Sequence, residues 1–197
     1  MKKILTLLLA AALVAVLAGC GKPAAPKLAF KNTDVTGLGY AREFVLTDHT
    51  GHPRTLADYK GKLVLMFFGY TQCPDVCPTT MADMAQVMQE MGPQAEQVQV
   101  LFVTVDPERD TQQLLAQYVP AFDKRFVGLY GDAAATAKVA KEFKVYYAKV
   151  EGETDESYTV DHTAGTYVFD REGKIRLFVR HGEKPAAIAH DLKLLLS

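Results

Sequence analysis

Two cysteines, each followed by a proline, stand four residues apart in the segment FGYTQCPDVCPTT (68–80). They are Cys73 and Cys77, and they come directly after the apolar run LVLMFFGY (63–70). Thiols can form a disulfide, exchange with other thiols or bind a soft metal ion. One helical turn brings Cα atoms four residues apart to about 6 Å, which is within the range that a disulfide spans.

Three interpretations of this pair stay open when only the residues are considered. A structural disulfide would close a loop of a few residues and therefore add little stability. A redox pair is indicated by the place of the cysteines between a strand and a helix, although a thioredoxin motif has one residue fewer between its cysteines. Two thiolates are too few for structural zinc, so a metal site would hold a soft ion, and outside the cytoplasm copper fits best.

We predict that the helix after the cysteines begins at Pro78 and runs to about Met91, because proline is favoured as the first residue of a helix. Cys77 would then be the N-cap. A thiol there faces unpaired backbone N–H groups and the positive end of the helix dipole, which favours the thiolate. Four methionines share one face of this helix, which predicts core packing: Met81, Met84, Met88 and Met91.

A metal site would need a third ligand, and histidine is the natural choice. Four of the five histidines have surface explanations in hairpin turns, after a strand or on the terminal helix: His49, His52, His181 and His190. His162 stands in YTVDHTAGTYVFD (158–170), directly after Asp161 and before an apolar strand. We expect it in a loop able to fold over the cysteine turn, but position alone does not decide its role.

The elements that must position these residues alternate along the chain. Two apolar segments predict strands buried on both faces of a sheet, at 63–70 and 98–106. Further helices are expected over 111–118, 133–143 and 185–196, and hairpins within 42–62 and 165–182. The pattern predicts an α/β fold with a central mixed sheet flanked by helices on both faces, in one domain.

The N-terminus has a different character. Two lysines precede an apolar run from Ile4 to Ala18, which is typical of a secretion signal. The run is shorter than the ~20 residues of a membrane-spanning helix, although an uncleaved anchor is the alternative. The residues LAGC resemble a bacterial lipobox, which implies removal of residues 1–19 and acylation of Cys20.

We therefore expect a lipoprotein signal peptide over 1–19, a tether over 20–37 and the folded domain over 38–197. Such a protein would be anchored to a bacterial membrane by lipid, on the extracytoplasmic, periplasmic side. Two cysteines would remain in the folded domain, in a compartment where thiols oxidise unless they are kept reduced or bound to metal.

Composition supports one globular domain. The chain has 197 residues, of which 49% are hydrophobic and 23% charged, with a net charge of −1. That is enough apolar material for a core, and it argues against an intrinsically disordered chain. No run of lysine and arginine could track phosphates, so we expect no nucleic-acid partner.

Together these segments resemble the Sco (synthesis of cytochrome c oxidase) or SenC family of copper-binding, thioredoxin-like proteins. The matching blocks cover nearly all of the chain from about residue 40: GKLVLMFFGYTQCPDVCPTTM (61–81), TVDPERDT (104–111), FVGLYGD (126–132), VYYAKV (145–150) and YTVDHTAGTYVFD (158–170). The order and spacing of the cysteine and Asp-His blocks make this resemblance specific.

The resemblance implies a thioredoxin-like fold in which Cys73, Cys77 and His162 bind one copper ion, as Cu(I) or Cu(II). It matches Asp161 to the family's acidic residue beside the ligand histidine, and implies that Asp161 supports His162 without binding the metal itself. Members of this family help to assemble the dinuclear copper centre of cytochrome c oxidase subunit II by handing over copper, by reducing the recipient's cysteines, or both. The expected partners are subunit II and other copper chaperones, and we expect a monomer.

The main alternative to a copper metallochaperone is an extracytoplasmic thiol-disulfide oxidoreductase that cycles between the Cys73–Cys77 disulfide and dithiol. His162 distinguishes the two, because a pure thiol exchanger does not need an imidazole beside the pair. A peroxidase that uses Cys77 is less favoured, since the Thr-x-x-Cys context and the arginine partner expected there are not evident.

Overall fold

The structure is a computed structural model that describes residues 28–152 and 157–197. The predicted signal peptide (1–19), Cys20 and the first residues of the predicted tether lie outside the described residues. No helix in the described ranges combines the length and the apolar character needed to cross a membrane.

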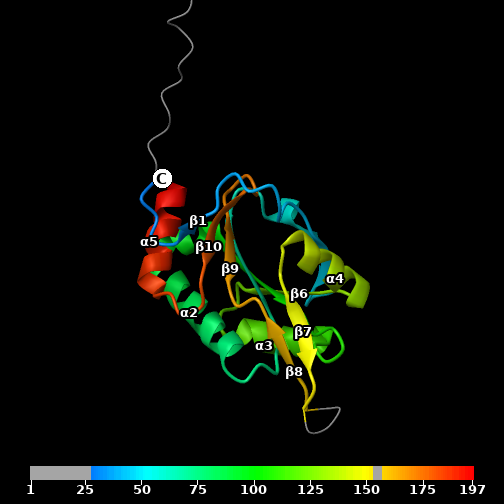
Figure 1. Ribbon diagram of the computed structural model, residues 1–197. Coiled ribbons are helices and arrows are strands. Elements are labelled where there is room, and N and C mark those ends of the chain that lie inside the picture. Colours follow the sequence, from blue (N-terminus) through cyan, green and yellow to red (C-terminus); the bar gives the residue numbers. More distant parts are fainter. Residues whose placement is uncertain (1–27, 153–156) are drawn as a thin grey trace, which may run out of the picture.

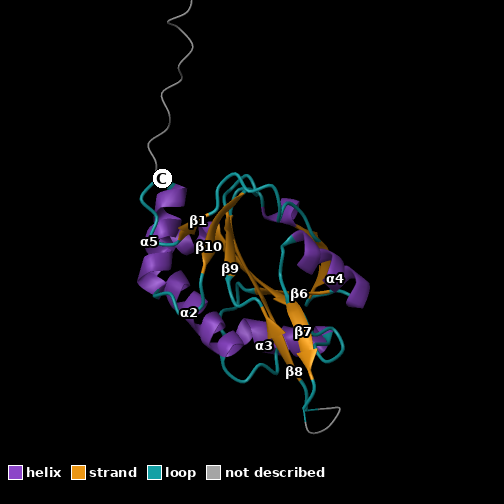
Figure 2. Cartoon of the chain, viewed as in Figure 1, coloured by secondary structure: helices purple, strands orange, loops and turns teal. Residues whose placement is uncertain are grey.

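Among the described residues, eight strands form one sheet in the order β1-β10-β9-β4-β5-β6-β2-β3 (Figures 1 and 2). The central pairs β4–β5 and β5–β6 are parallel and the remaining pairs are antiparallel. The strands are β1 (Thr33–Asp34), β2 (Val45–Asp48), β3 (Pro53–Thr55), β4 (Leu63–Gly69), β5 (Val98–Thr104), β6 (Val127–Tyr130), β9 (Thr166–Phe169) and β10 (Ile175–Val179). The sheet is mixed, as predicted.

The two central strands are buried at every position. β4 and β5 pair in parallel from Leu63 opposite Val98 to Gly69 opposite Thr104. Helices cover both faces of the sheet at this point, which explains why these segments are apolar without alternation. Both strands had been predicted, and they end together at the edge where the cysteine loop begins.

Helices α2 (Val76–Met91) and α5 (Pro185–Leu196) pack against each other on one side of the sheet (Figure 1). α3 (Gln112–Tyr118) contacts β6, and α4 (Ala133–Glu142) contacts β2. Short 3-10 helices are η1 (Leu56–Tyr59), η2 (Gly92–Gln97) and η3 (Val119–Ala121). The four methionines of α2 are all buried, which confirms that they belong to the core.

A separate hairpin was not predicted. β7 (Tyr147–Val150) and β8 (Thr159–His162) form an antiparallel pair in which Tyr147 lies opposite His162. The expectation that His162 lies in a loop is therefore wrong, because it is the last residue of β8. Strands of four residues that are mostly exposed give only a weak alternating signal.

The folded domain also begins earlier than predicted. Thr33 pairs with Phe178 of β10, and the backbone N–H groups of Lys31 and Asn32 donate to the carboxylate of Asp191 in α5. The tether predicted over 20–37 is therefore wrong for residues 31–34. These backbone groups find partners at the sheet edge and at a buried carboxylate instead of in water.

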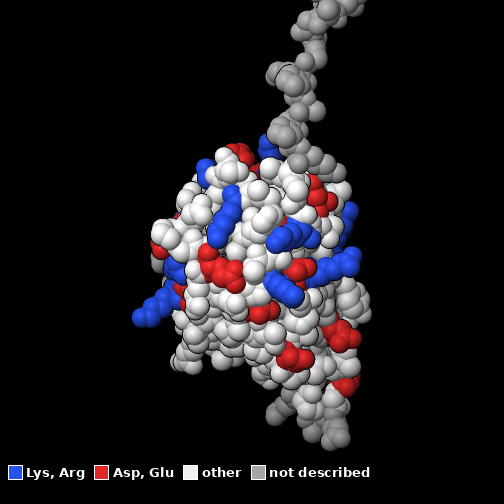
Figure 3. Space-filling view, turned by 90° about the vertical axis from the view of Figure 1, so that its left-hand side faces the viewer, with Lys and Arg blue, Asp and Glu red and all other residues white. Residues whose placement is uncertain are grey.

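Charged side chains on the side of α5 and α2 are of both signs. Figure 3 shows lysine and arginine interspersed there with aspartate and glutamate. This mixture is what the nearly neutral net charge leads one to expect on a surface.

Candidate metal centre

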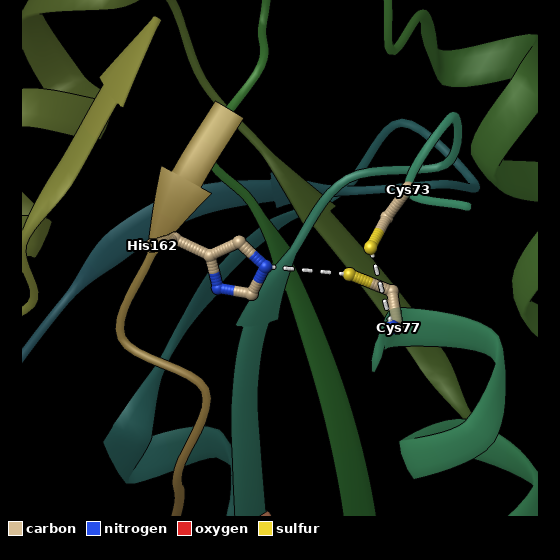
Figure 4. Close-up of side chains that lie close together, drawn as sticks. All are labelled: Cys73, Cys77 and His162. Carbon is tan, nitrogen blue, oxygen red and sulfur yellow. Dashed lines mark hydrogen bonds between the residues drawn. The ribbon is translucent and has the colours of Figure 1, made fainter. Parts of the chain in front are cut away.

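Three side chains from separate parts of the sequence converge where the central strands end. Cys73 lies in the loop after β4, Cys77 in the first turn of α2, and His162 at the end of β8. One ligand atom from each lies within 4.8 Å of the others. Figure 4 shows the imidazole of His162 pointing at the sulfur of Cys77, with Nε2 3.5 Å from Sγ.

The two cysteines are both free thiols, and Cys73 is partly exposed while Cys77 is buried. The backbone N–H of Cys77 donates to Sγ of Cys73 at 3.4 Å. The loop between them is anchored at Tyr70, whose carbonyl accepts the N–H of Cys73 at 3.3 Å. Both sulfurs are therefore held at one end of the helix.

Helix α2 begins at Val76 with Asp75 as its N-cap, two residues before the predicted start. Cys77 is therefore inside the helix, and its prediction as the N-cap is wrong. Pro78 occupies the third helical position, where a missing N–H costs little because the first four N–H groups of a helix have no partner within it.

The electrostatics of Cys77 also differ from the prediction. Burial raises the pKa of its thiol above the usual value, and a hydrogen bond with the Tyr70 backbone opposes this shift only in part. The helix start was expected to favour the thiolate, but complete burial dominates. A bound cation would supply the positive charge that a buried thiolate needs, and metal binding would release the thiol proton.

His162 is oriented by a backbone group. Its Nδ1 lies 3.1 Å from the carbonyl oxygen of Thr163, so a proton on Nδ1 satisfies this contact and leaves the Nε2 lone pair facing Cys77. Burial lowers the pKa of the imidazole, which favours the neutral form that binds metals. The rings of Phe67 and Tyr70 meet the imidazole edge-on at centroid distances of 5.9 and 6.0 Å.

Asp161 does not take the orienting position expected of it. Its side chain is exposed, whereas the neighbouring His162 is partly buried, as alternation along β8 requires. The orienting contact comes from the carbonyl of Thr163. The Asp161 charge raises the pKa of His162, but this influence is smaller than the lowering by burial.

Gly69, the last residue of β4, makes room for the site. A Cβ at this position would lie 2.8 Å from Sγ of Cys77, 2.8 Å from the Phe67 ring and 3.1 Å from the Phe102 ring. Sequence reasoning missed this requirement. The glycine stands in the quoted cysteine segment, but its role depends on packing between elements.

Asp110 holds the start of the cysteine loop in place through hydrogen bonds. Its buried carboxylate accepts hydrogen bonds from the hydroxyl of Thr104 at 2.6 Å and from the backbone N–H of Thr71 at 3.1 Å. Burial raises the pKa of Asp110, while these hydrogen bonds oppose the shift. The contacts tie the segment after β4 to the end of β5.

The donor set fits a soft ion. Two sulfurs and one imidazole nitrogen match the ligand types that copper takes in proteins, and the group is compatible with copper binding. The other histidines are engaged elsewhere or exposed. His49 accepts the N–H of Gly128 through Nδ1 at 2.9 Å, so it is structural and not merely solvated.

The fold and the site define a thioredoxin-like protein with a Cys-Cys-His group suited to a soft metal at the carboxyl ends of its central strands. The family model described as SCO1/SenC matches residues 35–197 of the chain. The chain therefore belongs to the SCO1/SenC family.

Relatives of known name and structure agree with this assignment. The chain is 42% identical to the structure of Bradyrhizobium japonicum ScoI with copper bound, which it matches over 78% of its own length and 97% of that chain, with a TM-score of 0.72. It is 36% identical to apo Sco1 from Thermus thermophilus, over 87% of this chain and 99% of that chain, with a TM-score of 0.76.

Among curated proteins, the chain is 41% identical over 133 residues to the mitochondrial SCO2 homologue of Bos taurus, covering 66% of this chain and 50% of the relative. It thus spans about half the length of that relative. The thioredoxin-like α/β fold predicted from the sequence is confirmed.

Proposed function

We propose that this protein is a copper metallochaperone that holds one copper ion, as Cu(I) or Cu(II), between Cys73, Cys77 and His162. The observation that carries the proposal is the 3.5 Å approach of His162 Nε2 to Cys77 Sγ. The carbonyl of Thr163 turns Nδ1 away and leaves the metal-binding nitrogen beside two sulfurs. Copper bound in a structurally similar relative supports the choice of ion.

The proposed task is assembly of the dinuclear copper centre of cytochrome c oxidase subunit II. Support comes from membership of the SCO1/SenC family and from the resemblance of the cysteine and Asp-His blocks. A monomer that receives copper from another chaperone and delivers it to subunit II would need a ligand set that can release the ion. Three ligands leave a coordination position open for an incoming donor.

We further propose that the protein works at the extracytoplasmic, periplasmic face of a bacterial membrane. Residues 1–19 would be removed and Cys20 would carry the lipid. The folded domain, which begins by residue 31, would stand at the end of a tether shorter than the predicted 20–37. The anchor would raise the effective concentration of the copper site near a membrane-bound oxidase.

A second function, thiol-disulfide exchange, is favoured by the state of the cysteine pair. Cys73 is partly exposed and free, and its sulfur already accepts the N–H of Cys77. The two thiols would lose two electrons and two protons as they form a disulfide, and a disulfide in the recipient would gain them. Such activity could prepare the cysteines of a copper recipient.

Copper stoichiometry of the purified protein tests the proposal. Elemental analysis should give one copper per chain, and Cys73→Ala or Cys77→Ala should abolish binding. The matched controls are Met84→Leu and Met88→Leu, which remove thioether sulfurs from the buried face of α2 and should keep full copper. Full copper in either cysteine variant would overturn the proposed site.

A further inference from the structure

The hairpin that carries His162 is a two-stranded sheet of its own, so side-chain contacts as well as its link to β9 place it against the cysteines. Tyr158 directly precedes β8 and is buried. Its ring lies against the ammonium of Lys149, within the hairpin, and against the guanidinium of Arg109, from the loop after β5, which also contacts its backbone.

Arg109 joins three groups at once. Its Nε donates to Oδ2 of Asp106 at 2.6 Å, and its Nη1 donates to the carbonyl of Tyr158 at 2.8 Å. The guanidinium carbon lies 3.5 Å from the centroid of the Tyr158 ring, which is a close cation–π contact. The hydroxyl of Tyr158 donates to Oδ1 of Asp106 at 2.8 Å, which closes the cluster.

The cluster is shielded from water. The Arg109 side chain is 15% exposed and that of Asp106 is 4% exposed. Burying an ion pair rarely adds net stability, although removing one partner is costly. The planar guanidinium of Arg109, however, fixes the position of every group that it contacts. The effect of this cluster is therefore on geometry.

Arg109 also reaches the site itself. Its guanidinium carbon lies 5.7 Å from the centroid of the Tyr70 ring, and that ring meets the imidazole of His162 edge-on. Nη1 of Arg109 is 3.4 Å from the side-chain oxygen of Gln72, the residue before Cys73. The same side chain thus contacts both the hairpin and the cysteine loop.

We propose that Arg109 is a positioning residue that holds the β7–β8 hairpin against the cysteine loop and so keeps His162 within reach of the metal. This inference rests on the proposed copper site. Arg109 does not touch the metal ligands' reacting atoms, and it acts through Tyr158 and Tyr70.

The proposal predicts a specific defect in copper binding when Arg109 is substituted. The thiolates of Cys73 and Cys77 remain and can still hold Cu(I), which is the softer ion. Cu(II) depends more on the imidazole nitrogen. Loss of the Arg109 contacts should therefore weaken Cu(II) binding more than Cu(I) binding.

The test uses Arg109→Lys and Arg109→Ala in the full chain. Lysine keeps the charge but cannot bond Asp106 and Tyr158 in one plane. We expect Cu(II) affinity to fall about tenfold or more, as is common when a group that orients a ligand is removed, with an altered Cu(II) absorption and EPR spectrum. Cu(I) affinity should fall less than Cu(II) affinity.

The matched control is Arg125→Ala. Arg125 makes a comparable two-point ion pair with Asp123, at 2.9 and 2.6 Å, but on an exposed part of the surface. This variant should keep the wild-type Cu(II) spectrum. Tyr158→Phe, which removes only the hydroxyl bond to Asp106, provides a milder variant should Arg109→Ala fail to fold, and its Cu(II) affinity should also fall.

A metal-free readout separates this inference from the proposed function. Amide hydrogen exchange of Tyr147–Val150 and Thr159–His162 should be faster in Arg109→Lys than in wild type, with the central strands unchanged. Wild-type hairpin exchange and a wild-type Cu(II) spectrum in Arg109→Lys would overturn the positioning role. A wild-type protein that binds no copper would overturn the proposed function and leave the exchange test in force.

Discussion

A β-carbon on Gly69 would come within 2.8 Å of Sγ of Cys77, closer than side-chain carbons pack in proteins. The carbonyl of Gly69 accepts the N–H of Val105, so β4 cannot move aside without breaking this bond to the chain beyond β5. The place of the Cys77 sulfur therefore depends on the absence of a side chain at the end of the strand.

Gly69→Ala should displace the sulfur and weaken copper binding, with an altered charge-transfer spectrum. Gly131→Ala is a matched control, because its Cβ would meet Ala135 and Leu46 at 2.9 Å each and no metal ligand. Overpacking costs about 1–3 kcal/mol, so both variants should unfold at lower urea concentrations. Only Gly69→Ala should change the copper spectrum, and an identical spectrum in the two variants would contradict this role.

His162→Ala should separate the two proposed chemistries. Without the imidazole, Cu(II) binding should weaken strongly and Cu(I) binding less, since two thiolates suit the softer ion. The Cys73–Cys77 pair should still form a disulfide in a redox titration. His52→Ala, at an exposed side chain, serves as the control. Loss of disulfide formation in His162→Ala would place the imidazole in the thiol mechanism and favour the oxidoreductase.

Cys20→Ser should block lipidation while copper binding by the purified protein stays unchanged. Cys20 lies outside the described residues, so this prediction rests on the LAGC sequence alone. Cell fractionation and mass spectrometry of the N-terminal peptide provide the measurement. An unmodified Cys20 peptide still joined to residues 1–19 would instead support an uncleaved membrane anchor.

The sequence predicted the features that repeat along one element. Continuous apolar runs located β4 and β5, and the helix pattern from Pro185 to Leu196 located α5 with its observed bounds. The methionine spacing located the buried face of α2. The grouping of Cys73, Cys77 and His162 came from the family resemblance, since no local pattern places residues so distant in sequence together.

The features that the sequence did not predict involve contacts between elements or backbone groups. The carbonyl of Thr163 orients His162, and any residue supplies a carbonyl, so no side chain signals this contact. The family resemblance implied a supporting role for Asp161, but strand alternation turns its side chain to the surface. The start of α2 was misplaced because a proline is tolerated anywhere in the first helical turn.

Asp191 joins the N-terminal segment to the folded domain. Its buried carboxylate accepts the N–H groups of Lys31 and Asn32 at 2.9 and 2.8 Å and the side-chain amide of Asn32 at 2.9 Å. Burial by itself would raise the pKa of Asp191, but the hydrogen bonds from Lys31, His190 and Asn32 lower it overall. The folded protein therefore favours the charged carboxylate.

A lowered pKa in the folded state sets the pH dependence of this contact. The stabilisation is present above the unfolded pKa of about 4, and it is lost as pH falls through the lower folded pKa. Asp191→Asn should reduce the free energy of unfolding at pH 7 by about 1–3 kcal/mol, because buried donors lose a charged acceptor. Near pH 3 the Asp191 carboxylate of the wild type becomes protonated, so the free energy of unfolding of the wild type should approach that of the variant.

Urea unfolding at pH 7 and pH 3 checks this expectation, with Glu151→Gln as an exposed control that should match wild type at both pH values. Hydrogen exchange should show faster exchange at Lys31 to Asp34 in Asp191→Asn, because the segment loses its attachment to α5. Copper stoichiometry should stay at one per chain. A stability difference that is as large at pH 3 as at pH 7 would show that Asp191 acts through packing and not through its charge.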